Sequence, residues 1–155
     1  MEIYTDGSCI NNPGIGGWAF IIQREDGNIS RWANSQKVTT NNEMEMTAVI
    51  KSIEYCRLKK YDTDLVIYTD SNYVKMGITK WIHNWKKNGW KNAKKEDVKN
   101  AELWKILDEL INDYDGEIRF EHVKAHSTNM MNNKVDLLAN SAARNTTTTE
   151  FIGIN

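Results

Sequence analysis

A short stretch that ends in a carboxylate occurs twice in the sequence. Residues 3–8 read IYTDGS and residues 67–72 read IYTDSN, so Asp6 and Asp70 each follow an Ile-Tyr-Thr run. Runs of β-branched and aromatic residues closed by Gly, Ser or Asn predict strands that enter turns. Ligand sites gather beyond the carboxyl ends of parallel strands, so the two acids would lie together if these strands are neighbours. Alternatively, each Asp only hydrogen-bonds the amides of its own turn.

Two further acids are candidates to join this pair. Glu45 lies in a predicted helix over residues 43–60, at the edge of the face that should be buried. It could instead close a capping box that begins at Asn42. Asp136 lies at the start of a predicted helix over residues 135–144, where its charge could equally stabilise the helix N-terminus.

Four converging carboxylates, without a cluster of Cys or His, favour a hard divalent cation. Mg²⁺, with Mn²⁺ as an alternative, prefers carboxylate oxygens and retains waters that a phosphate can displace. Two such ions about 3.5–4 Å apart can activate a water and stabilise the leaving oxygen of a phosphodiester. The acids Asp6, Glu45, Asp70 and Asp136 therefore predict a site that cleaves phosphodiesters.

The distribution of charge predicts a polyanionic partner. The 155 residues, 40% hydrophobic and 26% charged, indicate one globular domain with a net charge of −1. Residues 80–99 nevertheless contain seven lysines and two acids, a local balance of +5. Such a basic segment suggests that nucleic acid or another polyanion is met at one place. Its lysines, among them Lys86, Lys87 and Lys91, interleave with Trp81, Trp85 and Trp90.

The sequence predicts a soluble, cytoplasmic protein with no membrane partner. No apolar run approaches the roughly 18 residues of a spanning helix, and no basic segment followed by an apolar one opens the chain. Cys9 and Cys56 lie far apart, which argues against a disulfide framework.

The order of predicted elements favours an α/β fold. Five strands are predicted, over residues 2–8, 16–25, 29–38, 65–70 and 116–125. The first three form an antiparallel meander, and the helix over residues 43–60 makes a crossover that lays the fourth strand parallel to an earlier one. Residues 71–112 are predicted to be helical in pieces, with breaks at Gly77 and at Asn88-Gly89. The clearest late helix covers residues 102–111, and residues 144–155 are predicted to be a loosely attached tail.

Four segments resemble, in order and spacing, the type 1 ribonuclease H family in its bacterial form with a basic protrusion. They read YTDGSCINNPGIGGWAF, TTNNEMEMTAVI, YTDSNYVKMGITKWIHNWKKNGWK and HVKAHSTNMMNNKVDLLA, and they fall within a catalytic domain of residues 1–143. The resemblance implies a ribonuclease H-like α/β fold: a five-stranded mixed sheet, three antiparallel strands and then two parallel ones, flanked by helices. It also implies Mg²⁺-dependent endonucleolytic cleavage of the RNA strand of RNA/DNA hybrids. The expected products carry 5′-phosphate and 3′-hydroxyl ends, and we expect a monomer.

The resemblance assigns the family's four metal-binding carboxylates to Asp6, Glu45, Asp70 and Asp136. It also matches His126 to a histidine on a mobile loop, which could move a proton to or from the departing 3′ oxygen. Without the flanking pattern, His126 would read as an idle loop histidine.

Two positions depart from the family pattern. Ala125 stands where Gly is frequent, and Asn133 stands where an additional Glu is common. The first could stiffen the loop that carries His126. The second leaves metal preference open.

Amides near the acids are candidate contacts to the hybrid. Asn12, Asn42 and Asn72 occupy predicted loops beside three of the carboxylates and could reach base edges and sugars in a shallow minor groove. Turn formation is the alternative role. The resemblance places Thr40 at a DNA phosphate, although it could simply neighbour a helix cap.

The basic protrusion would hold the DNA strand away from the scissile bond. Lys86, Lys87 and Lys91 would neutralise phosphates, which gives affinity that is independent of sequence and sensitive to salt. We expect Trp85 and Trp104 to pack in the interior and Trp81 to reach the DNA strand.

Three other functions remain open at this point. The chain could be another nuclease or a strand-transfer enzyme of the same fold. It could be a hybrid-binding module without activity, which predicts broken carboxylates. It could also be a small domain whose acids cap turns and whose lysines only face solvent.

Overall fold

Three strands joined by short turns form one half of the sheet. The computed structural model describes residues 1–124, 129–144 and 153–154. In it, β1 (Glu2–Cys9), β2 (Gly14–Gln23) and β3 (Ile29–Thr39) pair antiparallel, which confirms the predicted meander. Side chains alternate along each strand, so Ile3 belongs to one hydrophobic core and Tyr4 to a second core on the opposite face.

A helical crossover places the next strand beside β1. α1 (Asn41–Leu58) leads to β4 (Leu65–Thr69), which pairs parallel to β1 with Tyr4 opposite Tyr68 and Thr5 opposite Thr69. β5 (Ile118–His122) continues the sheet parallel to β4. The order β5-β4-β1-β2-β3 confirms the predicted five-stranded mixed sheet.

The end of the predicted tail adds a short sixth strand. β6 (Gly153–Ile154) pairs antiparallel with β3, with Arg31 opposite Gly153 and Ser30 opposite Ile154. The prediction of a loosely attached tail did not include this pairing. Two residues are too few to show a strand period in the sequence.

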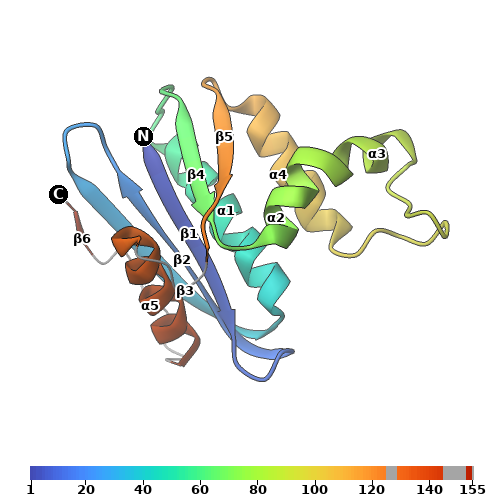
Figure 1. Ribbon diagram of the computed structural model, residues 1–155, viewed down its shortest axis with the longest axis horizontal. Helices are drawn as coiled ribbons and strands as arrows, with labels where there is room; N and C mark the ends of the chain where they lie inside the picture. Colours follow the sequence, from blue (N-terminus) through green and yellow to red (C-terminus); the bar gives the residue numbers. More distant parts are fainter. Residues whose placement is uncertain (125–128, 145–152, 155) are drawn as a thin grey trace.

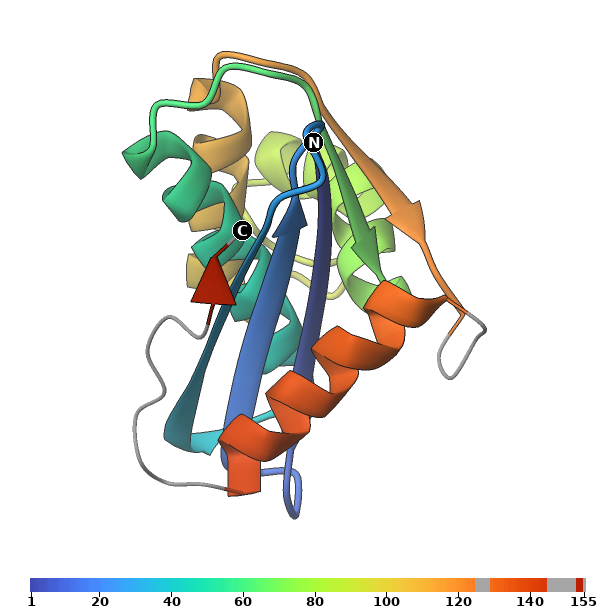
Figure 2. The ribbon, with the colours of Figure 1, turned by 90° about the vertical axis from the view of Figure 1, so that its left-hand side faces the viewer.

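Helices cover both faces of the sheet (Figures 1 and 2). α1 and α4 (Ala101–Asp113) lie on one face, and α5 (Met130–Arg144) lies diagonally across the other. Small residues let α5 approach the sheet, because a Cβ on Gly17 of β2 would come within 2.4 Å of the Ala139 carbonyl oxygen.

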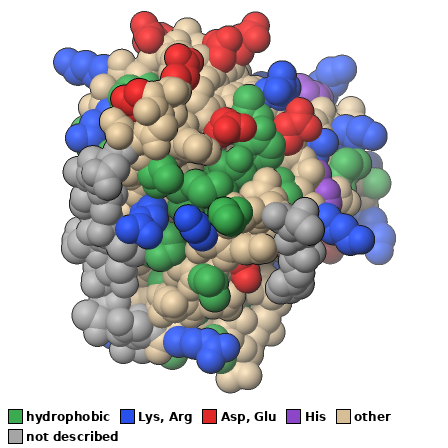
Figure 3. Space-filling view, turned by 60° about the vertical axis from the view of Figure 1, so that its left-hand side comes forward, with side chains coloured by type: hydrophobic (Ala, Val, Ile, Leu, Met, Phe, Trp, Pro, Cys, Tyr) green, Lys and Arg blue, Asp and Glu red, His purple; other side chains and the backbone are tan. Residues whose placement is uncertain are grey.

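The α5 side of the sheet is covered only in part. α5 packs on β1, β2 and β3, and none of the helices in the described part of the chain lies over β4 and β5 on that side (Figure 2). There Tyr68 of β4 stacks on Tyr4 of β1 with ring centroids 4.7 Å apart. Apolar side chains gather in the middle of the face shown in Figure 3, with acidic side chains above them. Such faces of an antiparallel or mixed sheet tolerate water on one side.

An unbroken helical arm leads from β4 to the basic segment. α2 (Asn72–Met76), the π-helix η1 (Gly77–Trp81) and α3 (Ile82–Lys87) follow one another directly, so the predicted break at Gly77 was wrong. Glycine is needed there for close packing, because a Cβ would come within 2.0 Å of Cη2 of Trp104. The predicted break at Asn88-Gly89 is confirmed, since Asn88 ends α3 and Gly89 has a φ of +66°.

None of the helices within the described ranges is long and apolar enough to cross a membrane.

Candidate active site

Asp6 and Asp70 lie at the same level of the sheet. The parallel pairing of β1 with β4 ends at Thr5 and Thr69, and each acid is the next residue in the sequence: Asp6 within β1, and Asp70 directly after β4. β1 itself continues along β2 to Cys9, so Asp6 lies within this strand rather than in a turn. The repeated hexapeptide therefore brings two carboxylates side by side, as predicted, beyond the last parallel pair.

Glu45 reaches this pair from the first turns of α1. Thr40 caps the helix: its Oγ1 accepts a hydrogen bond from the Glu43 N–H at 3.2 Å and donates to Oε1 of Glu43 at 3.1 Å. Thr40 is therefore the N-cap residue and pairs with Glu43, so the alternative that Glu45 closes a capping box from Asn42 was wrong. Glu45 is 8% exposed, and its Oε1 accepts a hydrogen bond from the backbone N–H of Gly7.

The three carboxylates form one cluster. Asp6, Glu45 and Asp70 each offer an oxygen, and these oxygens lie within 4.8 Å of one another. Burial, with the neighbouring Asp136 and Asp70, raises the pKa of Asp6 to about 8, although a hydrogen bond with Glu45 acts in the opposite direction. Burial and the charges of Asp6 and Asp70 likewise raise the pKa of Glu45 well above its usual range. Such a group of like charges is relieved by a cation between them, and its all-oxygen donors fit Mg²⁺ or Mn²⁺.

Asp136 approaches the cluster from the other face of the sheet. It lies in α5, which begins at Met130, so Asp136 is nearly two turns inside the helix. The helix-terminus alternative was therefore wrong, because that field falls off within the first turn. Hydrogen bonding and repulsion from Asp136 both raise the pKa of Asp6, and the two side chains line the same pocket.

All four acids open onto one pocket. Its walls are formed by Asp6, Gly7, Ser8, Asn41, Asn42, Glu45, Asp70, Ser71, Asp136 and Asn140. Of the predicted hybrid contacts, Asn42 lies in this wall, whereas Asn12 and Asn72 are exposed outside it. Oδ1 of Asn12 accepts a hydrogen bond from the Asn41 N–H at 3.2 Å, which ties that loop to the start of α1.

The sequence did not single out five pocket residues: Gly7, Ser8, Asn41, Ser71 and Asn140. One signal was available for Asn140, because it follows Asp136 by four positions and so shares its helix face. Ser8 belongs to β1, two residues after Asp6, and therefore points to the same side of that strand.

Two residues of the predicted histidine loop lie outside the described residues. His126 and Ala125 fall in this gap, so the role of His126 stays a prediction. Asn133 lies exposed in the first turn of α5, and its backbone N–H donates to the Asn129 carbonyl at 3.1 Å.

Three tryptophans, two from the helical arm and Trp104 from α4, divide as expected between interior and surface. Trp104 is fully buried, Trp85 packs against the core, and Trp81 is 37% exposed. Their rings form a continuous row, in which Trp81 lies 6.0 Å from Trp85 and Trp85 lies 5.5 Å from Trp104.

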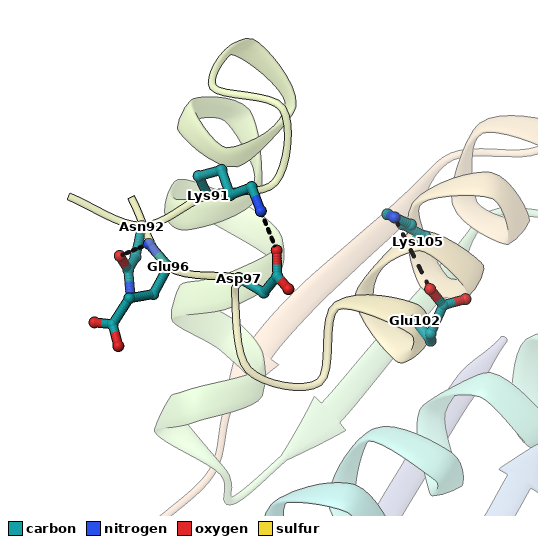
Figure 4. A network of polar contacts seen from close by, with 6 residues as sticks. All are labelled: Lys91, Asn92, Glu96, Asp97, Glu102 and Lys105. Carbon is teal, nitrogen blue, oxygen red and sulfur yellow. Dashed lines mark hydrogen bonds and ion pairs between the residues drawn. The ribbon is translucent and has the colours of Figure 1, made fainter. Parts of the chain in front are cut away.

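Two of the three predicted phosphate-binding lysines already pair with acids. Nζ of Lys86 lies 3.1 Å from Oδ2 of Asp108 on α4. Lys91 pairs with Asp97 across the loop of the protrusion, as Figure 4 shows. Lys87 is exposed and forms no ion pair with any residue in the described ranges. Because ion pairs between exposed side chains contribute little free energy, a phosphate can replace the acid as the partner of either lysine.

The fold and the acid cluster define a ribonuclease H-like domain. The family model for RNase H matches residues 1–144. The chain is 48% identical over 139 residues to a ribonuclease H of Parvibaculum lavamentivorans, covering 90% of this chain and 89% of that protein. It is 48% identical over 145 residues to a ribonuclease H of an Enterobacter species, covering 94% and 90%. The chain therefore belongs to the ribonuclease H family and is an enzyme of this class.

Solved structures agree with this assignment. LC9-RNase H1, described as a type 1 RNase H with the type 2 active-site motif, superposes with a TM-score of 0.82 at 28% identity, covering 97% of this chain and 75% of that one. LC11-RNase H1, solved in complex with an RNA/DNA hybrid, superposes with a TM-score of 0.72 at 22% identity, covering 92% and 96%. The second likeness is one of fold.

Proposed function

We propose that the protein is an endonuclease that hydrolyses the RNA strand of RNA/DNA hybrids with two divalent ions, leaving 5′-phosphate and 3′-hydroxyl ends. The observation that carries this proposal is the convergence of Asp6, Glu45 and Asp70, with oxygens within 4.8 Å of one another, in a pocket that Asp136 also lines. A hybrid-binding module without activity would not need to keep all four acids. A domain whose acids only cap turns would not bury Asp6 and Glu45 together.

In this proposal the four carboxylates hold Mg²⁺, with Mn²⁺ as an alternative. When bound, the ions supply an activated water and stabilise the leaving oxygen of the RNA linkage. The chain holds the acids for this purpose: the Gly7 N–H donates to Oδ1 of Asp6 at 2.9 Å and also to Glu45. His126 would move a proton to or from the departing 3′ oxygen.

The hybrid would lie across the pocket and the basic protrusion, residues 80–99. Asn42 in the pocket wall, with Asn12 and Asn72 nearby, would contact the minor groove. Thr40, at the N-terminus of α1, would meet a DNA phosphate, because free N–H groups and the helix dipole favour an anion there. Exposed Trp81 and the lysines Lys86, Lys87 and Lys91 would contact the DNA strand. The protein would act as a monomer in the cytoplasm.

One assay tests this function. Labelled RNA/DNA hybrid, RNA duplex and DNA duplex are incubated with Mg²⁺ and the wild type, with Asp70→Asn, or with Asp115→Asn. Asp115 is an exposed acid in the turn before β5, so it controls for the loss of one charge. We expect cutting of the hybrid alone, lost in Asp70→Asn and kept in Asp115→Asn. Cutting of all three duplexes, or full activity of Asp70→Asn, would contradict the proposal.

A further inference from the structure

The side-chain amide of Asn140 joins α5 to the strand β1 at the edge of the pocket. Its Nδ2 donates to the backbone oxygen of Asp136 at 3.0 Å and to Oδ1 of Asp136 at 3.2 Å. Its Oδ1 accepts a hydrogen bond from Oγ of Ser8, in β1, at 2.7 Å. Asn140 therefore links the carboxylate of α5 to the strand that carries Asp6.

The partners fix which way this amide points. Two acceptors of Asp136 face the NH₂ group, and a hydroxyl that can donate faces the oxygen. If the amide were turned over, its oxygen would face two oxygens, which cannot hydrogen-bond to one another. The Ser8 hydrogen bond thus sets the direction in which Asn140 presents its donors to Asp136.

Asp136 needs such support more than the other acids do. Asp6 and Glu45 are 4% and 8% exposed and share the Gly7 amide. Asp136 is only half-buried and comes from a helix on the opposite face of the sheet. A carboxylate in that position can rotate toward solvent unless a neighbour holds it. Such a rotation would move its oxygens away from the other metal ligands and so lower the affinity for the metal.

We propose that Asn140, anchored by Ser8, is a positioning residue that holds the Asp136 carboxylate toward Asp6, so that both can ligate the same divalent ion. The proposal rests on the proposed function, because it takes Asp136 as a metal ligand. An amide suits this task better than Lys or Arg, since it donates hydrogen bonds without neutralising the charge that attracts the ion. Residues that orient metal ligands in this way typically change metal affinity by about 10- to 100-fold when replaced.

Mg²⁺ binding to the metal-free protein, measured by calorimetry, tests the proposal without reference to cleavage. Asn140→Leu keeps the size of the side chain and removes both polar groups; we expect its Kd for Mg²⁺ to rise by about 10-fold. Ser8→Ala leaves the Asn140 donor in place and removes its anchor, so a smaller rise is expected. Ser141→Ala, at an exposed neighbour on α5, should leave the Kd unchanged. The unfolding free energy of each metal-free variant is measured in the presence of a chelator, so that a change in stability can be told apart from a change in Mg²⁺ affinity.

A double-mutant cycle between Asn140 and Asp136 tests whether Asn140 acts through Asp136. In an Asp136→Asn background, adding Asn140→Leu should change the Kd for Mg²⁺ by less than about twofold, because the carboxylate to be oriented is gone. Equal effects in both backgrounds would overturn the proposal. So would a loss of unfolding free energy in Asn140→Leu and Ser8→Ala with the Kd of the wild type, since Asn140 would then only tie α5 to β1.

The outcome is separable from that of the proposed function. If the wild type binds Mg²⁺ with the expected response to Asn140→Leu but cuts no hybrid, the proposed function fails and the positioning role stands. If the wild type cuts hybrid while Asn140→Leu and Ser8→Ala bind Mg²⁺ as the wild type does, the positioning role fails alone.

Discussion

Gly7 of β1 and Glu45 of α1 are joined by a hydrogen bond from the Gly7 backbone N–H to Oε1 of Glu45. The same N–H donates to Oδ1 of Asp6, so one backbone donor serves two carboxylates from different elements. This is feasible only because Gly7 has no side chain: a Cβ would lie 2.3 Å from the Glu45 nitrogen and 2.4 Å from the Met44 carbonyl carbon. The close approach of α1 to β1 thus sets the position of Glu45.

Gly7→Ala should separate α1 from β1 and move Glu45 away from Asp6. We expect a loss of about 1–3 kcal/mol in the unfolding free energy, from overpacking, together with a clear rise in the Kd for Mg²⁺. Chemical denaturation and calorimetry measure the two quantities. Gly27→Ala is the control: Gly27 lies in the distant β2–β3 hairpin with a φ of +88° and open space around it. It should lose stability through backbone strain while binding Mg²⁺ normally. Normal Mg²⁺ binding by Gly7→Ala would refute this role.

The stability of the metal-free protein should fall as the pH rises from about 5 to about 8. Burial, with the neighbouring Asp136 and Asp70, raises the pKa of Asp6 from 3.8 to about 8, so the folded protein holds a proton that the unfolded chain releases over this interval. The resulting stabilisation is complete below the ordinary pKa and is lost as the pH rises through the raised one. Its slope is at most about 1.4 kcal/mol per pH unit for this group. The raised pKa of Glu45 acts in the same direction.

Denaturation by urea in a chelator, repeated across this pH range, measures the slope. Asp6→Asn removes the titrating group and should reduce the slope. Saturating Mg²⁺ should abolish it in the wild type, because the bound ion favours the ionised carboxylates. An identical pH dependence in Asp6→Asn and the wild type would rule out this assignment.

Asp108→Asn should tighten binding of the hybrid. Asp108 pairs with Lys86 at 3.1 Å and so competes with a phosphate for this lysine. Because an exposed ion pair contributes at most about 1 kcal/mol, we expect a gain of about threefold in affinity at low salt. Asp113→Asn is the control, because it makes the same change of charge on α4. Asp113 is exposed and forms no ion pair with any residue that the structure describes. Equal gains in both variants would show that net charge alone is responsible.

Thr40 should have two separable roles. Thr40→Ala removes the cap of α1 and should cost about 1 kcal/mol of unfolding free energy. Thr40→Asp keeps a capping oxygen, so its stability should stay within about 0.5 kcal/mol of the wild type, but its charge repels a DNA phosphate and should raise KM. Thr40→Ser retains both roles and is the control. A wild-type KM for Thr40→Asp would show that no phosphate binds at this position.

The sequence was sufficient to predict that the four acids converge and to predict the five main strands. The repeated Ile-Tyr-Thr-Asp run carries both a strand period and an acid at a fixed place, so pairing of its two copies brings Asp6 and Asp70 together. The sequence alone made Glu45 and Asp136 candidates with structural alternatives left open, and the family resemblance then assigned both to the metal site. The structure decided between these alternatives, through the cap at Thr40 and through the early start of α5 at Met130.

Other features depend on contacts between distant segments and left no local signal. Gly77 reads as a helix breaker, but its neighbour Trp104 comes from another helix and requires the absence of a side chain. The hydrogen bond between Ser8 and Asn140 spans 132 positions of the chain. Pairing of β6 with β3 likewise depends on how the chain returns to the sheet, rather than on residues near Ile154.

The row of aromatic rings that follows β4 begins beside the pocket lined by the four acids. Tyr73, three positions after Asp70, lies 5.9 Å from Trp81, and the row continues through Trp85 to Trp90. Interlocked rings resist stretching and bending. For an enzyme that acts as proposed, this stiffness fixes the distance along the duplex between the bound DNA phosphates and the cleaved RNA linkage. That distance should be the same on every hybrid, whatever its sequence.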